Sequence, residues 1–304
     1  MMFRKTLQFV AFFLPAPFNI WIHRIYGARI GRRVSLHPGV LLLASQVHLG
    51  DDAIIKAGTM INVRNFKLGE KSKIGYFTLV KGSEDLIVGN AGIIGPRCMI
   101  DCTRTVTLGY YCGIGPGSYL YTHGSGMPVT EGYRATFGPI SLEEKVWISM
   151  RCVLGPGVAV GKGSCLMPGT VLLESIPKKR LVSGNPVKLR VVSLCTIKYS
   201  EDNIRNLASK TLAEFSQYVI GRNWGVENLE EGSLVINRKK HLFKITIENG
   251  GDVEILLSPG VKGDGVYLNF GDLKTCELTN SIKMDFENFL RFNYGLIFIH
   301  GDFK

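Results

Sequence analysis

Apolar residues recur at every sixth position through the middle of this chain. The unbroken series consists of Leu142, Ile148, Leu154, Val160, Leu166 and Leu172. Small residues such as Cys152 and Ser164 follow four positions after an apolar one. Neither an α-helix, with a period of about 3.6, nor a β-strand, with a period of about 2, produces a strict period of six. The pattern predicts a solenoid in which each hexad forms one short flat side.

The same phase runs backward through the chain in groups of three hexads. The groups start at Leu108, Ile114 and Leu120; Val88, Ile94 and Ile100; Leu68, Ile74 and Val80; Leu49, Ile55 and Ile61; and, more weakly, Ile30, Leu36 and Leu42. We expect the apolar positions to point inward and each coil to pair with the next about 4.8 Å away. About seven coils, from Ile30 to near Leu172, would then form a prism roughly 30 Å long.

The repeat is interrupted once, and the interruption contains a histidine. Leu142 follows Leu120 by 22 positions, where a regular array needs six. A long loop on a rigid prism has no packing role, and such loops often carry function. His123 lies at the root of the loop, so we predict that it is catalytic.

Residues 192–304 leave the repeat and predict a small α+β domain of unknown role. Residues 201–219 have helical spacing, and Asp285–Phe292 reads as a short helix. Strand-like runs at 233–237, 241–248, 253–257, 265–270 and 296–300 are separated by Gly, Asn and Lys turns.

Residues 1–29 combine apolar and basic side chains. The apolar stretch 6–22 is broken by Pro15 and Pro17, so it is too short to span a bilayer, and no signal-peptide cleavage motif follows it. It has two interpretations: a cap over the first coil, or a segment that contacts an anionic membrane. We expect a cytoplasmic protein, which under the second interpretation is peripheral at the inner face of the membrane.

Positive charge is concentrated in the repeat and its N-terminal flank. Residues 1–196 carry 23 Lys and Arg against 10 Asp and Glu, whereas residues 197–304 carry 13 against 15. Aromatic residues are not interleaved with the basic ones as in a nucleic-acid stacking platform, so we expect no nucleic-acid partner. A phosphate-bearing cofactor and a membrane surface fit the charge better.

Several motifs resemble the hexapeptide-repeat O-acetyltransferases, which fold as left-handed parallel β-helices. The shared features are the histidine at the loop root, Lys145-Val146-Trp147-Ile148, and the closing Ile176-Pro177…Gly184-Asn185-Pro186-Val187-Lys188. They are similar to the galactoside and maltose enzymes, and the lead-in Tyr26-Gly27-Ala28-Arg29-Ile30-Gly31 is similar to colanic-acid-type members. The resemblance covers residues about 25–191. It implies left-handedness, acetyl-CoA as co-substrate and a homotrimer with clefts between prisms.

The chemistry implied is transfer of an acetyl group to a sugar hydroxyl. His123 would act as general base, because an imidazole accepts a proton near neutral pH, with direct transfer in a ternary complex. A backbone N–H near a corner would stabilise the oxyanion. Asp101 stands where the family often has an acceptor-binding asparagine, and it would bind the acceptor, orient His123 or face solvent. Glu131 and Arg134 are further acceptor-contact candidates.

The family resemblance also implies a groove for acetyl-CoA along the later coils. The matching residues are Trp147, Ser149, Pro168, Gly169, Lys188 and Arg190, with Lys178-Lys179-Arg180 as further candidates for a phosphate. Glu174 departs from the family pattern, where relatives often have lysine, and it would repel a phosphate.

Other functions of the same fold stay open. A γ-class carbonic anhydrase needs three histidines on one zinc, but His37 and His48 lie about four coils from His123. Cys98, Cys112 and Cys152 fall on the small position of a hexad, so we interpret them as corner fillers and expect no metal. A non-catalytic scaffold and an acetyltransferase for an antibiotic or amino acid remain the alternatives to an enzyme acting on a surface polysaccharide.

Overall fold

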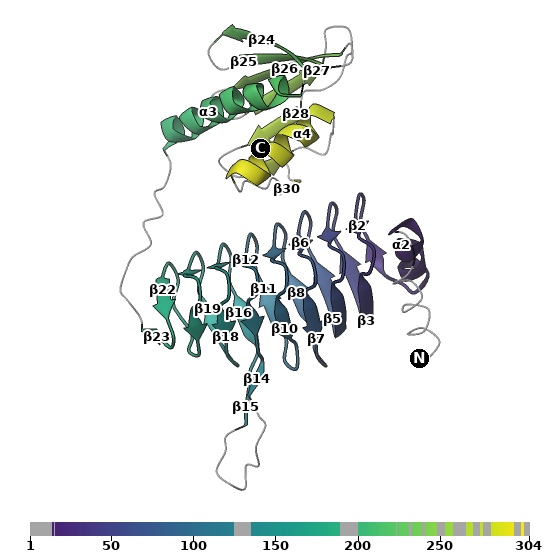
Figure 1. The fold of residues 1–304 in the computed structure, drawn as a ribbon, viewed down its shortest axis with the longest axis vertical. Helices are drawn as coiled ribbons and strands as arrows, with labels where there is room; N and C mark the ends of the chain where they lie inside the picture. The colour runs from purple at the N-terminus through teal and green to yellow at the C-terminus, as the bar shows by residue number, and fades with distance from the viewer. Residues whose placement is uncertain are drawn as a thin grey trace. The chain divides into compact units, whose positions relative to one another are not determined.

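Short parallel strands wind into a three-sided solenoid in the computed structural model of this protein (Figure 1). The structure describes residues 14, 16–124, 135–188, 200–222, 224–230, 233–238, 241–247, 253–257, 266–269, 274–275, 281–294 and 299–300. The chain divides into two units, Met1–Cys195 and Thr196–Lys304. The first unit is the predicted left-handed parallel β-helix, and the second has the predicted α+β composition.

One side of the prism, the second face, is a stack of short strands. It consists of β2 (Ser35–Leu36), β4 (Ile54–Ile55), β6 (Lys73–Ile74), β9 (Ile93–Ile94), β12 (Gly113–Ile114), β17 (Trp147–Ile148), β20 (Cys165–Leu166), β22 (Leu181–Gly184) and the antiparallel β23 (Val187–Lys188). The parallel stack from β2 to β22 gives eight coils, one more than predicted. The additional coil is closed by β22, which pairs in register with β20.

The other two sides belong to one twelve-stranded sheet. The first face contains β1 (Arg29–Ile30), the ends of β3 (Leu41–Leu49) and β5 (Met60–Leu68), β8 (Leu86–Val88), β11 (Val106–Leu108), β16 (Ile140–Leu142) and β19 (Ala159–Val160). The third face contains the beginnings of β3 and β5, then β7 (Leu79–Lys81), β10 (Met99–Asp101), β13 (Tyr119–Leu120), β18 (Val153–Leu154) and β21 (Val171–Leu172). The faces merge because β5 pairs with β7 through Met60–Asn62 and with β8 through Phe66–Leu68.

Apolar residues at the hexad starts fill the interior of the prism. On the second face Ile55, Ile74 and Ile94 are fully buried, and the same holds for the corresponding residues of the other faces. Small residues close the corners, and many of them donate a hydrogen bond to the next coil: Thr78 Oγ1 to Gly95 O at 2.9 Å and Cys98 Sγ to Gly115 O at 3.3 Å. The corner cysteines therefore satisfy backbone carbonyls as well as filling space.

The helix α2 (Ala16–Ile25) lies at the first coil (Figure 1). Ile20 packs against the core cluster and Ile22 is buried, whereas Phe18, Trp21 and Ile25 are exposed. The buried side fits a cap, and the apolar exposed side fits a membrane segment. Contact with a membrane stays a prediction, which binding to anionic vesicles would test. Among the described residues, no helix combines the length and hydropathy needed to cross a bilayer.

The second unit packs two helices against a mixed sheet, in which β29 and β30 are parallel and the other described pairs are antiparallel. Its elements are α3 (Glu201–Ile220), β24 (Gly225–Glu230), β25 (Ser233–Arg238), β26 (His241–Ile247), β27 (Val253–Leu257), β28 (Val266–Asn269), β29 (Lys274–Thr275), α4 (Ser281–Tyr294) and β30 (Ile299–His300). Ser200 caps α3 by accepting the N–H of Asn203. Phe215 of α3 packs against Phe286 and Phe289 of α4, with ring centroids 4.8 and 5.3 Å apart.

The alternation of buried and exposed side chains along β5 gives a direct test of the fold. Ile61 is fully buried and its neighbour Met60 is 44% exposed. Ile61→Ala should lower the free energy of unfolding by about 2–5 kcal/mol, because it leaves a cavity in a stacked core. Met60→Ala, the matched control, should change it by about 0.5 kcal/mol. Equal losses in equilibrium urea denaturation would contradict the inward phase of the hexads.

Candidate active site

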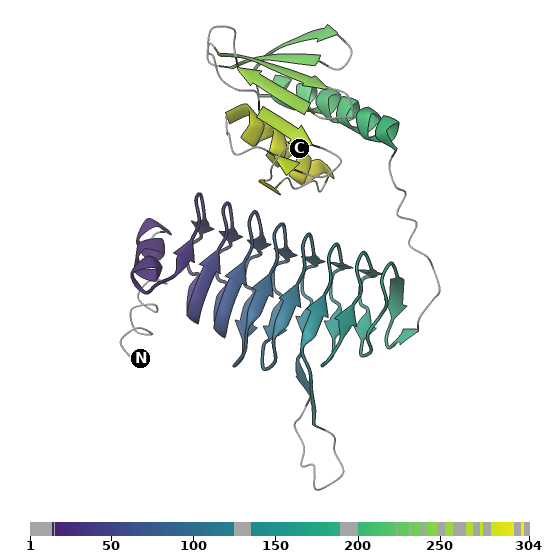
Figure 2. The same ribbon diagram turned by 180° about the vertical axis from the view of Figure 1, so that it is seen from behind.

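The insertion leaves and rejoins the prism without disturbing the register of the coils. Its first residues form β14 (His123–Gly124), which pairs antiparallel with β15 (Thr136–Phe137). The N–H of Gly138 donates to the carbonyl of Thr122 at 3.0 Å. The chain then continues as β16, paired on either side with β11 and β19. His123 thus stands at the corner between the third and first faces, where the hairpin projects (Figure 2).

Asp101, one coil earlier at the same corner, holds the imidazole of His123. Its Oδ2 lies 2.8 Å from Nδ1 of His123. The same oxygen accepts the hydroxyl of Thr122 at 2.6 Å and the N–H of Thr122 at 3.2 Å. The Thr103 hydroxyl donates to Oδ1 at 2.9 Å. Asp101 is only 3% exposed, so the alternative of an aspartate facing solvent is wrong.

The charge of this carboxylate determines which ring nitrogen carries the proton. Burial raises the pKa of Asp101, but hydrogen bonds from Thr122, His123 and Thr103 outweigh it and hold that pKa below its usual value. An ionised carboxylate only accepts, so Nδ1 of His123 must donate, and in the neutral imidazole the lone pair is then on Nε2. The side chain of His123 is 38% exposed, and no described residue forms a hydrogen bond with Nε2. The arrangement therefore presents a proton acceptor to solvent.

Two residues beside His123 were not identified from the sequence. The ring of Phe137, half exposed, lies nearly parallel to the imidazole at a centroid distance of 6.2 Å. The guanidinium of Arg104 covers the Phe137 ring at 5.2 Å. Phe137 could have been found as an aromatic residue within the insertion and off the inward hexad positions. Arg104 follows Asp101 by three positions at the same corner.

The residues predicted to bind acetyl-CoA gather elsewhere on the prism. Trp147 is half exposed on the second face, and its ring lies against the backbone of Gly113. Ser149, Pro168 and Gly169 occupy stacked corners between the second and third faces, where the Gly169 N–H donates to the carbonyl of Met150 at 3.0 Å. His123 stands at a different corner, so one chain does not bring these residues together with it.

Some predicted residues lie outside the described part of the chain. Glu131, Arg134 and Arg190 are among the residues not described. Lys188 lies in β23, where its backbone pairs with Ser183 of β22 at the end of the second face. Glu174, the departure from the family pattern, is exposed.

The cysteines are poor candidates for nucleophiles. Burial raises the thiol pKa of Cys98, Cys102, Cys112, Cys152 and Cys165. A thiol is nucleophilic as its thiolate, which these environments disfavour. Within the described residues, no three His, Cys, Asp or Glu side chains gather as a metal site.

Comparison with known proteins connects this chain to acetyltransferases. No family model matches it. A Schizosaccharomyces pombe protein provisionally named an acetyltransferase is 29% identical over 125 residues, 41% of this chain and 51% of that protein. The Escherichia coli protein provisionally named colanic acid biosynthesis acetyltransferase WcaF is 25% identical over 164 residues, 54% of this chain and 68% of that protein. The chain thus spans about half the length of the first relative.

Three solved structures are similar to this chain at low TM-scores and low sequence identity. A hexapeptide-repeat acetyltransferase of Vibrio cholerae complexed with acetyl coenzyme A has a TM-score of 0.37 and 17% identity, covering 63% of this chain and 85% of that one. The polysialic acid O-acetyltransferase OatWY has a TM-score of 0.45 and 14% identity, covering 56% and 94%. The Bacillus cereus N-acyltransferase AntD has a TM-score of 0.36 and 14% identity, covering 63% and 95%. The sequence relatives, one of them named for colanic acid biosynthesis, confirm the predicted resemblance to acetyltransferases of this kind.

The ionised state of Asp101 predicts a pH-dependent contribution to stability. Because its pKa is depressed in the folded state, its stabilisation is present above the unfolded value of about 3.9 and is lost as pH falls through the folded pKa. Asp101→Asn should cost about 1–3 kcal/mol at pH 7, and the difference from wild type should narrow only below about pH 4. Urea denaturation from pH 7 to pH 3 measures it. Glu174→Gln, which changes an exposed carboxylate, is the control, and a gap independent of pH would contradict the assignment.

Proposed function

We propose that this protein is an acetyl-CoA-dependent O-acetyltransferase that modifies a sugar hydroxyl of a surface polysaccharide or its precursor, with His123 as general base. The observation that carries the proposal is the hydrogen bond between Nδ1 of His123 and the buried Asp101 carboxylate, which leaves Nε2 exposed. The resemblance to proteins named as acetyltransferases supplies the class of reaction.

The reaction proceeds by direct transfer. The acceptor oxygen attacks the thioester carbonyl carbon of acetyl-CoA while Nε2 of His123 takes the hydroxyl proton. The C–S bond breaks, and the proton passes to the departing thiolate. Asp101 is a positioning residue, because its oxygens already accept from Thr103, Thr122 and His123. It stabilises the imidazolium that forms when Nε2 is protonated.

The surroundings of Nε2 favour a sugar over a smaller acceptor. Phe137 is half exposed beside the imidazole, and the guanidinium of Arg104, which carries hydrogen-bond donors, lies over its ring. Ligand sites of this kind combine aromatic surface with a few directed polar groups. Glu131 and Arg134, in the same insertion, are further acceptor contacts in this proposal.

A homotrimer would complete the site with acetyl-CoA from a neighbouring prism. Trp147, Met150 and Met167 are large apolar side chains exposed on or beside the second face, and exposed apolar patches often mark interfaces. In this proposal Trp147, Ser149, Pro168, Gly169, Lys188 and Arg190 contact acetyl-CoA and face His123 of another subunit. Analytical ultracentrifugation should give the mass of three chains. A mass of one chain, 33.6 kDa, would contradict the trimer.

Thiol release from acetyl-CoA across a panel of nucleotide sugars and glycan fragments tests the proposal. His123→Ala should lower kcat by roughly 10²-fold or more with the active acceptor, because no group then takes the hydroxyl proton. Asp101→Asn should lose about 10²- to 10⁴-fold, because an amide that donates to Nδ1 places the proton on Nε2.

Matched variants separate catalysis from folding. His37→Ala changes another prism histidine far along the chain and should keep wild-type turnover. Asp101→Glu should recover part of the activity lost in Asp101→Asn, since it restores an acceptor for Nδ1. Wild-type turnover by His123→Ala with an active acceptor would place the base elsewhere.

A further inference from the structure

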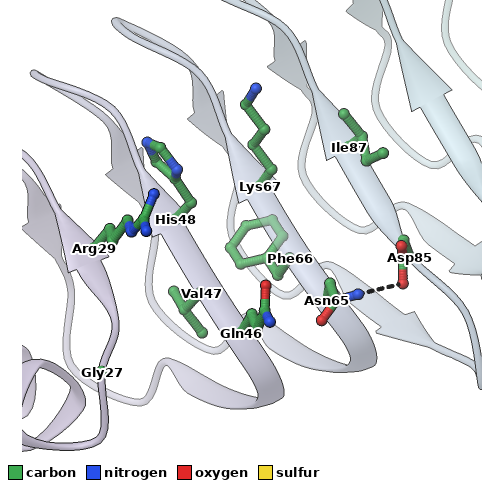
Figure 3. Close-up of a pocket in the computed structure, with 10 residues that line it drawn as sticks. All are labelled: Gly27, Arg29, Gln46, Val47, His48, Asn65, Phe66, Lys67, Asp85 and Ile87. Atoms are coloured by element: carbon green, nitrogen blue, oxygen red, sulfur yellow. Dashed lines mark hydrogen bonds between the residues drawn. The ribbon is translucent and has the colours of Figure 1, made fainter.

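A cavity lies on the first face, over the N-terminal coils. The cavity has a volume of about 440 Å³ (Figure 3). Its lining residues are Gly27, Arg29, Gln46, Val47, His48, Asn65, Phe66, Lys67, Asp85 and Ile87. None of them belongs to the sites described above.

Three basic side chains form a row across this cavity. Arg29 is in register with His48 in the next coil, and His48 with Lys67 in the coil after it. All three are exposed, and no described residue forms a hydrogen bond or ion pair with any of them. Neighbouring coils lie about 4.8 Å apart, so this basic row spans roughly 10 Å.

The basic row has no evident structural role. Arg29 and Lys67 carry like charges two coils apart on the same face, and like charges do not hold a sheet together. The acid among the lining residues, Asp85, is already engaged, since it accepts from Arg64 at 2.8 Å and from Asn65 at 3.1 Å. The cavity therefore keeps a net positive charge that a ligand can neutralise.

Side-chain amides accompany the basic row. Gln46 and Asn65 are in register with each other, two positions before His48 and Lys67. Figure 3 shows them along the lower edge of the cavity, with Asn65 bonded to Asp85. Amides donate and accept, which suits hydroxyl groups beside an anionic one.

The first face leads from this cavity toward His123. Along it Lys67 is followed in register by Ile87, Thr107 and Ser141, and the insertion that His123 begins leads into the strand of Ser141. Along the corner, Arg64 pairs with Asp85, and Arg104 approaches Glu84 at 3.6 Å and covers Phe137. Three coil spacings, or about 14 Å, separate Lys67 from the corner of His123.

We propose that the basic row binds the carboxylate groups of an elongated acidic glycan acceptor while one of its sugar hydroxyls reaches His123. This inference rests on the proposed function and names its substrate class. The basic groups are spread along a line at coil spacing rather than converging on one point, which fits charges repeated along a chain better than a single phosphate. Each exposed ion pair contributes little alone, so two or three together give a modest, salt-sensitive preference.

The experiment is calorimetric titration of the full-length protein at low ionic strength with a uronate-containing tetrasaccharide and with its carboxyl-reduced counterpart. Wild type should bind the acidic tetrasaccharide about tenfold more tightly. Arg29→Gln/Lys67→Gln should bind the acidic tetrasaccharide and its carboxyl-reduced counterpart with the same affinity. Arg205→Gln/Lys210→Gln, which removes the same charge from the exposed side of α3, should keep the preference.

Other occupants of the cavity have their own outcomes. Equal binding of the two tetrasaccharides by wild type, or a preference that persists in Arg29→Gln/Lys67→Gln, would overturn the inference. So would a tenfold loss of coenzyme A affinity in that variant, which would assign the row to cofactor phosphates. If Arg29→Gln/Lys67→Gln loses binding to phosphatidylglycerol vesicles, and wild type shows no preference between the two tetrasaccharides, the basic row would be assigned to lipid headgroups.

Failure of the proposed function gives a different result. His123→Ala should keep the preference for the acidic tetrasaccharide over its carboxyl-reduced counterpart, because that preference comes from the basic row and not from the base. An intact carboxylate preference in a protein that never releases thiol would refute the acetyl transfer and leave the binding site standing. Thiol release with neutral acceptors alone would support acetyl transfer and refute the binding of an acidic glycan by the basic row.

Discussion

Registered stacking of one coil upon the next is the constraint on which this β-helix depends. Every inward side chain lies above its equivalent in the previous coil, as in the column Ile55, Ile74 and Ile94. A slip of one residue would turn the apolar set outward. Corner side chains such as Thr78 and Cys98 reinforce the register, because each donates to a carbonyl of the following coil.

The same register brings together residues that are distant in sequence. Asp101 and His123 are 22 residues apart, yet they occupy one corner on adjacent coils. Arg29, His48 and Lys67 form a line because each is 19 residues from the next. The solenoid thus converts a sequence interval into a fixed separation, with backbone hydrogen bonds holding both partners in place. Preorganisation of this kind lets a histidine meet its carboxylate without ordering either side chain at the moment of reaction.

Much of the fold could be predicted from the sequence, because the solenoid repeats one local pattern, a hexad with an apolar first residue. The hexad starts, the corner cysteines and the helix at 201–219 needed no long-range information. The nine-residue strands β3 and β5 were not foreseen, since their corner between the third and first faces bends without a break in pairing. The strands β24 and β29 were also missed, and α4 begins four residues before the predicted Asp285.

The site was less predictable than the fold. His123 could be singled out because the repeat breaks beside it. The choice among roles for Asp101 depended on which donors surround its oxygens, and Thr103 and Thr122 come from two different coils. Phe137 and Arg104 meet only because the insertion returns as β15. Such contacts depend on the conformation of the loop, which the spacing of apolar residues in the sequence does not predict.

The anchoring of the insertion allows its sequence to change without a loss of stability in the coils. Its two ends are fixed by β14, β15 and the registered strand β16, so the coils on both sides keep their pairing whatever lies between. The entropic cost of closing a loop grows only slowly with its length. Segments of different length and composition could therefore be exchanged at this point with the histidine and its carboxylate unchanged, and under the proposed function each exchange would change the acceptor.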